Sequence, residues 1–329
     1  MKRFVPNLGT GLLVAAMAIG SAAVAQESAA SYPSKPIKIV VPYPPGGSTD
    51  AMARMVAQHM QQRIGQSVVV ENRAGAGSNV GAQFVAAQPA DGYTLLFGTS
   101  AALAVNTHLY PNLPYHPIKN FAPIVLGATL PSLVVVHPSL PVNNIRELNA
   151  YINANPDKVN YASAGNGTPA HLGVEMYKKS TGLKINHIPY KGGAPALTDL
   201  IGGQVQMMFA ILPESMPFVK DGRMRAIAVT TASRSGQAPD LPTVAESGVP
   251  GYDLTAWYAF VAPAGTPQDI VAKLNTAINA ALVDPEVRGK LLAAGFDVAG
   301  GTPDRLAQLM RTESVKWEKV VKDAKVKVD

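Results

Sequence analysis

The sequence predicts an α/β protein built from two lobes. Short segments rich in Val and Ile alternate with amphipathic segments of helical length, an alternation typical of α/β sheets. Glycine-rich loops recur where a predicted strand gives way to a predicted helix. An N-terminal export segment leaves roughly 300 residues, which exceeds the usual size of one domain and favours two lobes.

The first element in the chain is a predicted secretory signal peptide over residues 1–25. A basic start is followed by an apolar stretch at 12–19 and by the small residues Ala23-Val24-Ala25, which suit cleavage. The apolar stretch is shorter than the roughly 20 residues that a bilayer-spanning helix needs, which disfavours a membrane anchor. We therefore expect an exported protein whose mature chain begins near Gln26.

Strands and helices alternate through the rest of the chain. Strands are predicted from apolar, often β-branched runs between turn residues, at Ile37–Val41, Val68–Glu71, Thr94–Phe97, Ile124–Gly127, Leu133–Val136, Ile185–Ile188, Gln206–Phe209 and Ala226–Thr230. Helices are predicted from apolar residues at helical spacing, at Thr49–Ile64, Ser78–Ala87, Ile145–Ala154, Pro169–Thr181, Pro195–Ile201, Pro267–Val283, Glu286–Ala294 and Pro303–Lys322.

The composition excludes several classes of site. The chain has 0 cysteines, which excludes disulfides, thiol catalysis and thiolate metal sites. Its 6 histidines show no metal-binding spacing, and we expect neither a metal nor a cofactor. The formal charge of +6 is dispersed, without a basic stripe interleaved with aromatic residues, so nucleic acid is not an expected partner.

The loop after the first strand is the strongest candidate for ligand binding. It reads Tyr43-Pro44-Pro45-Gly46-Gly47-Ser48-Thr49, and its glycines let the backbone turn with exposed amides. Ser48 or Thr49 is expected to be the N-cap of the next helix. The first amides of a helix lack intrahelical partners and lie at the positive end of its dipole, so they can receive an anion.

A second loop of the same kind lies about a hundred residues further on. It reads Ser163-Ala164-Gly165-Asn166-Gly167-Thr168-Pro169, with Thr168 as the expected N-cap and proline at the favoured first helical position. No catalytic cluster is evident between the two loops. This combination predicts a protein that binds a small acid and does not transform it.

The third strand-to-helix junction adds two hydroxyl groups. In the segment Phe97-Gly98-Thr99-Ser100-Ala101-Ala102, Thr99 and Ser100 are candidate donors to a ligand oxygen, because ligands bind at the carboxyl ends of strands in open α/β sheets. Ala101 belongs to the same candidate loop. Simple capping of the following helix is the alternative interpretation.

Two titratable residues stand in the first turns of the helices that follow the glycine loops. His171 lies at the positive end of its helix dipole, so the neutral imidazole is favoured, and it is a candidate donor to a ligand carboxylate or to the loop backbone. Asp50 would repel a bound carboxylate. We therefore interpret Asp50 as a residue that organises its loop, with recognition of a ligand amine or a water as the alternative.

Two enzyme-like patterns are incomplete. The glycines of Gly75-Ala76-Gly77-Ser78-Asn79-Val80-Gly81 resemble a dinucleotide fingerprint, but the third comes one residue late and the acidic residue that binds ribose is missing. The chain also lacks the G-x-S-x-G elbow of serine hydrolases. We therefore expect no enzyme activity, and a hydrolase with a triad assembled by the fold is the weakest alternative.

The chain resembles the Bug family, the extracytoplasmic solute-binding proteins of tripartite tricarboxylate transporters. The motifs that carry the resemblance span the mature chain, and they are Pro42–Asp50, Gly165–Leu172, Pro189–Gly192, Pro242–Glu246 and Ala262–Pro267. The resemblance implies a periplasmic, monomeric, type II-like two-lobe binding protein with a ligand cleft between the lobes. It also implies that Tyr43–Thr49 and Ser163–Thr168 hold a carboxylate, and that membrane permease subunits receive the ligand.

One departure from the family bears on the ligand. Many members carry an acidic or amide pair after the strand Gln206–Phe209, where this chain has Ala210-Ile211. We expect Ala210 to line the far end of the cleft and to make it less polar. A less polar acid, aromatic or of medium chain length, then becomes a better fit than a citrate-like polyanion.

The alternation of strands and helices along the chain predicts the boundaries of the lobes. Lobe I is expected to hold residues 26–125 and 229–329, and lobe II residues 126–228. The chain would cross between them near 124–127 and 226–230, and these crossings would act as a hinge. In the alternative role, the closed form with its ligand docks on a periplasmic sensor domain of a membrane receptor in place of a permease.

Overall fold

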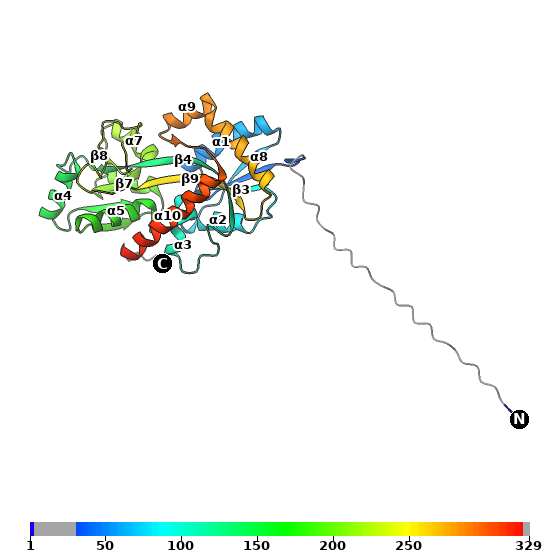
Figure 1. Ribbon diagram of the computed structural model, residues 1–329. Helices are drawn as coiled ribbons and strands as arrows, with labels where there is room; N and C mark the ends of the chain where they lie inside the picture. The colour runs from blue at the N-terminus through cyan, green and yellow to red at the C-terminus, as the bar shows by residue number, and fades with distance from the viewer. Residues whose placement is uncertain (3–30, 325–329) are drawn as a thin grey trace.

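A computed structural model describes residues 1–2 and 31–324, and these residues form one curled sheet covered by helices on both faces (Figure 1). The strands lie in the order β2-β1-β3-β9-β4-β7-β5-β6, with β8 and β10 each paired to β4. Their bounds are β1 Ile37–Val41, β2 Val68–Asn72, β3 Thr94–Thr99, β4 Phe121–Val136, β5 Asn160–Ser163, β6 Asn186–Pro189, β7 Met207–Ile211, β8 Arg225–Val229, β9 Thr255–Pro263 and β10 Asp297–Val298.

The helices confirm most of the predicted elements. Their bounds are α1 Ser48–Ile64, α2 Asn79–Ala86, α3 Asn106–Leu109, α4 Ile145–Ala154, α5 Pro169–Thr181, α6 Gly193–Ile201, α7 Leu212–Lys220, α8 Gln268–Val283, α9 Pro285–Ala293 and α10 Pro303–Ala324. Short turns η1 Ala76–Ser78 and η2 Ala101–Val105 precede α2 and α3. In the described part of the chain, no helix is long and apolar enough to cross a membrane. The predicted signal peptide lies outside the described residues, except for Met1 and Lys2.

Two elements near the middle of the molecule are missing from the sequence prediction. Strand β9 is almost entirely buried between β3 and β4, so its sequence TAWYAFVAP lacks the alternation that marks a half-exposed strand. Helix α7 contains Pro213 in its first turn and Pro217 inside it, and proline argues against a helix when only the sequence is read. Both elements contribute residues to the site described below.

Strand β4 joins the two halves of the sheet. The sequence predicts two short strands here, but the structure has one strand of 16 residues that runs through Pro123 and Pro131. It pairs with β9 as far as Pro131 and with β7 from Ser132 onward. Register irregularities along the β9 pairing accommodate a proline that cannot donate to the ladder.

Three chain segments lie side by side where β4 changes partner. Thr230 donates from its backbone amide to Ser132 O at 2.9 Å, and it accepts from the amide of Leu254 at 2.8 Å. Its hydroxyl also bonds to Leu254 O at 2.8 Å. Thus the predicted crossing at 226–230 lies beside Ser132 of β4. The other predicted crossing, at 124–127, lies earlier in β4, where Leu126 pairs with Ala259 of β9.

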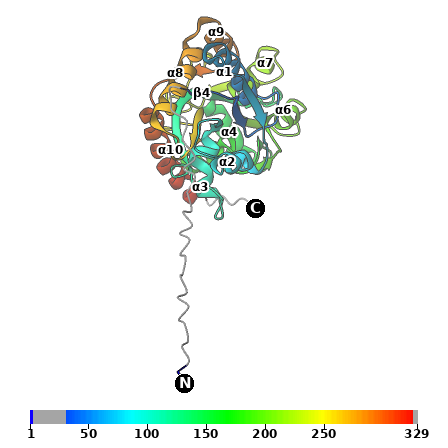
Figure 2. The same ribbon diagram turned by 90° about the vertical axis from the view of Figure 1, so that its right-hand side faces the viewer.

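The core is shared between the halves and is covered by α10. One apolar cluster contains Leu96 from β3 and Tyr161 from β5, which belong to opposite halves of the sheet. Helix α10 packs on η2, β4 and α5, so it contacts both halves. In Figure 2, α10 and α6 lie on opposite sides of the molecule. Trp317 of α10 is fully buried and donates to Glu313 at 2.9 Å.

Candidate ligand-binding site

The first glycine loop leads into α1, which begins at Ser48, one residue earlier than predicted. The N-cap is Gly47, with an extended backbone (φ −82°, ψ 173°) and no side-chain cap bond, so the prediction of Ser48 or Thr49 as N-cap is wrong. The physical reason is that the Ser48 hydroxyl bonds elsewhere, as described below, and is not free to cap. Gly46 adopts φ +89°, a left-handed conformation that favours glycine.

The start of α1 keeps unpaired amide donors. The amides of Ser48 and Thr49 have no acceptor in the described part of the chain, as expected for the first turn of a helix. The loop before them, from Pro44 to Gly47, is exposed to solvent. These donors, together with the positive end of the α1 dipole, can bind an anionic oxygen.

Asp50 organises this loop, as the sequence analysis expects. Its side chain is 4% exposed and accepts from the Gly46 amide at 3.0 Å, from Arg54 Nε at 3.0 Å and from Asn72 Nδ2 at 2.9 Å. Burial alone would raise the pKa of Asp50, but the hydrogen bonds from Arg54, Gly46 and Asn72 outweigh it and lower the pKa. The carboxylate is therefore held in place by the protein itself.

A polar cluster gathers behind the start of α1. Ser48 Oγ lies 3.0 Å from the Tyr258 hydroxyl and donates to Glu214 Oε1 at 3.2 Å. The Tyr43 hydroxyl lies 3.4 Å from Thr99 Oγ1, so two residues predicted from separate loops do meet. Burial raises the pKa of both tyrosines, which keeps them neutral hydrogen-bonding groups.

Glu214 and Tyr258 are site residues that sequence reasoning missed. They lie on α7 and β9, which are among the elements missing from the sequence prediction, and only folding brings them to Ser48. Glu214 belongs to the half of the sheet that contains β7, whereas Ser48 belongs to the half that contains β1. The Ser48–Glu214 hydrogen bond therefore joins the two halves at the site.

The second glycine loop is closed largely by its own hydrogen bonds. Thr168 caps α5 as predicted, accepting from the His171 amide. The Gly165 amide donates to Ser163 Oγ at 3.2 Å, and the Gly167 amide donates to His171 Nδ1 at 3.0 Å. The amide of Asn166, an exposed residue, has no acceptor in the described part of the chain. No hydrogen bond among the described residues joins this loop directly to the first.

Three stacked rings support this loop from behind. His171 and His187 stack at 4.0 Å between centroids, and Tyr161 stacks on His187 at 4.6 Å. His187 Nε2 lies 2.6 Å from Ser163 Oγ. The expectation of a neutral His171 agrees with its lowered pKa of about 4, for which burial is the largest cause. Burial first, and then the charge of His171, lowers the pKa of His187 to about 3.

These lowered pKa values predict acid instability. In the unfolded chain both imidazoles titrate near pKa 6.5, so the unfolded state binds more protons, and stability is lost as the pH falls below about 6.5. His171 alone should remove on the order of 2 kcal/mol between pH 7.5 and pH 5. We expect His187→Phe to give a shallower acid limb in urea unfolding measured across this range. A limb as steep as that of the wild type would contradict this assignment.

Three further residues predicted to bind the ligand, Ser100, Ala101 and Ala210, are all buried. Ser100 is 1% exposed and precedes η2 without a side-chain cap bond, and Ala101 is 3% exposed at the first position of η2, so capping by Ser100 does not explain this junction. Ala210 is 1% exposed inside an apolar cluster with Leu133 and Met208. The structure therefore does not bring Ala210 to the polar cluster around Ser48.

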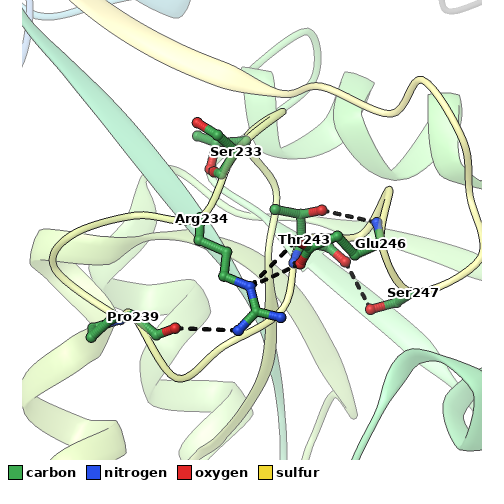
Figure 3. Close-up of polar contacts among 7 residues, drawn as sticks. Ser233, Arg234, Pro239, Thr243, Glu246 and Ser247 are labelled. Carbon is green, nitrogen blue, oxygen red and sulfur yellow. Dashed lines mark hydrogen bonds and ion pairs between the residues drawn. The ribbon is translucent and has the colours of Figure 1, made fainter.

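The motif at Thr243–Glu246 is a reciprocally bonded turn (Figure 3). The Thr243 amide donates to Glu246 Oε2 at 2.9 Å, and the Glu246 amide donates to Thr243 Oγ1 at 2.9 Å. Arg234 Nε also donates to Glu246 Oε2, at 3.0 Å. Thr243 forms a parallel bridge with Val229 at the end of β8, so the motif fixes the chain next to the crossing segment.

Similar proteins identify the family of this architecture. The family model described as tripartite tricarboxylate transporter family receptor matches residues 52–326. Protein BugT of Bordetella pertussis is 39% identical over 98% of this chain and 99% of its own length. The structure titled R. palustris Rpa4515 with adipate superimposes with a TM-score of 0.85 at 39% identity, covering 90% of this chain and 99% of that one.

A second ligand-bound structure supports the same family assignment. MatC from Rhodopseudomonas palustris, with bound malate, superimposes with a TM-score of 0.81 at 34% identity and covers 88% of this chain and 100% of that one. The resemblance inferred from the sequence motifs is thereby confirmed. The chain belongs to the Bug proteins, the solute-binding receptors of the tripartite tricarboxylate transporter family.

Proposed function

We propose that this receptor captures a short linear dicarboxylate in the periplasm and delivers it to the membrane subunits of a tripartite tricarboxylate transporter. The observation that carries the proposal is the start of α1, where the Ser48 and Thr49 amides can bind one carboxylate group. The ligands named for two similar structures, adipate and malate, are both dicarboxylates, which supports this class.

The receptor acts as a monomer whose two lobes close on the ligand. Lobe I comprises residues 26–125 and 229–329, and lobe II residues 126–228. The change of partner along β4 at Ser132, beside Thr230, supports a hinge at the crossing segments. The Ser48–Glu214 bond is the kind of contact between halves that a closed form makes. The protein performs no catalysis, and the ligand leaves unchanged.

Calorimetric titration and thermal unfolding of the mature chain test this function. Adipate and malate should each give saturable binding, and a ligand at 100 times its Kd should add roughly 2.7 kcal/mol to the free energy of unfolding. Small-angle scattering should show compaction with the saturating ligand. Dimethyl adipate, which has no charged carboxylate, is the control. Equal binding of the ester, or no binding of either acid, would refute the proposal.

A further inference from the structure

Glu214 brings a carboxyl group to the place where the carboxylate of a ligand is expected. Its Oε1 accepts from Ser48 Oγ at 3.2 Å, and Ser48 also supplies one of the unpaired amides of α1. Its Oε2 lies against Gly193, since a Cβ built on that residue would come within 2.3 Å of the oxygen. Glu214 therefore lies between the first residues of α1 and α6.

No positive charge compensates this carboxyl group. Glu214 forms no ion pair within the described residues. The strands β4 and β7, against which α7 packs, carry no charged side chain. On α6 the charged side chain is Asp199, which accepts from the Tyr190 hydroxyl at 2.7 Å, and the exposed Lys191 lies in the loop before it.

On the α1 side of the site, the described residues form no ion pair with Glu214 either. The charged residues of α1 that are closest to Ser48 in the sequence are Asp50 and Arg54, and they pair with each other at 3.0 Å. Facing Glu214 from β9 and from the first loop are the neutral hydroxyls of Tyr258 and Tyr43. Burial accordingly raises the pKa of Glu214, and the Ser48 hydrogen bond offsets only part of this effect.

A carboxylate bound at the Ser48 amide would thus meet a second carboxylate with no cation between them. Two carboxyl groups that share one site do not both ionise, because like charges at contact distance repel strongly. We propose that capture of the ligand takes up one proton from solvent, which the Glu214 carboxyl group holds and donates to a carboxylate oxygen of the ligand. This proposal rests on the function proposed above.

The proposal fixes the sign of the pH dependence. Over the pH range in which Glu214 is ionised in the free protein and protonated in the complex, the affinity should fall as the pH rises. One linked proton gives a tenfold increase in Kd for each pH unit at most. Below the pKa of free Glu214 the affinity should become independent of pH, because the free protein already carries the proton.

Calorimetry with adipate as the probe measures the proton directly. Titrations between pH 6.5 and 8.5, where adipate itself is a dianion, in buffers of different ionisation enthalpy, give the number of protons taken up, and we expect it to rise toward one in the wild type. Glu214→Gln keeps the shape and stays neutral, so its proton uptake should be absent and its Kd independent of pH. Glu286→Gln makes the same change on α9, where the side chain is 78% exposed, and should keep the uptake of the wild type.

The outcomes separate this proposal from the function on which it rests. Adipate binding to the wild type without proton uptake would overturn the role of Glu214 and leave the receptor function standing. Uptake that persists in Glu214→Gln would also overturn it. Absence of adipate binding at every pH would overturn both. If Glu214→Gln does not fold, the number of protons that the wild type takes up on binding adipate decides whether the proposal holds.

Discussion

Replacing Ser48 by proline should weaken carboxylate binding by about 10- to 150-fold, because it removes a backbone amide that binds the anion. A hydrogen bond to a charged group contributes about 1.5–3 kcal/mol, and each 1.4 kcal/mol is tenfold in affinity. The helix should persist, since Ser48 is the first residue of α1, where proline is favoured. The extended Gly47 before it, at ψ 173°, is compatible with a following proline.

The matched control is Ser48→Ala, which keeps the amide and removes only the hydroxyl group. The difference in binding free energy between the two variants therefore reports the amide, separately from the bonds of Ser48 to Glu214 and Tyr258. Titration calorimetry with adipate measures both, and circular dichroism checks that α1 is retained. Equal affinities for the two variants would show that the start of α1 does not bind the acid.

Truncation of Trp317 should produce the largest loss of stability. Its side chain is fully buried on α10, and removal of a buried tryptophan typically costs about 3–5 kcal/mol. The change also leaves Glu313, itself 9% exposed, without its bond from Trp317 Nε1, so that Trp257 at 3.4 Å and Lys316 at 3.3 Å are its remaining donors. Because α10 packs on both halves of the molecule, this loss weakens the contact that holds them together.

Urea unfolding followed by circular dichroism compares Trp317→Ala with Val315→Ala. Val315 lies on the same helix with 70% of its surface exposed, so its truncation should change the free energy of unfolding by no more than about 0.5 kcal/mol. A similar effect of the two variants would mean that α10 contributes little to the packing of the core.

Local sequence signals predicted the parts of the site that depend on the backbone. Gly46 and Gly167 adopt left-handed φ values of +89° and +75°, which is the freedom that made the two loops recognisable. Thr168-Pro169 predicted a helix start correctly because the cap and the proline act within one turn. The assignment of Ser48 as a cap failed because its hydroxyl has partners far away in the sequence.

The sequence by itself determined the α/β class, the two glycine loops, the organising role of Asp50 and the family, since each follows from residues close together in the chain. Only the tertiary structure decided that Glu214 and Tyr258 meet at Ser48, over separations of 166 and 210 residues. It also decided that Ala210 faces an apolar cluster. Contacts between distant segments depend on strand order and on the continuous path of β4, and neither leaves a local pattern in the sequence.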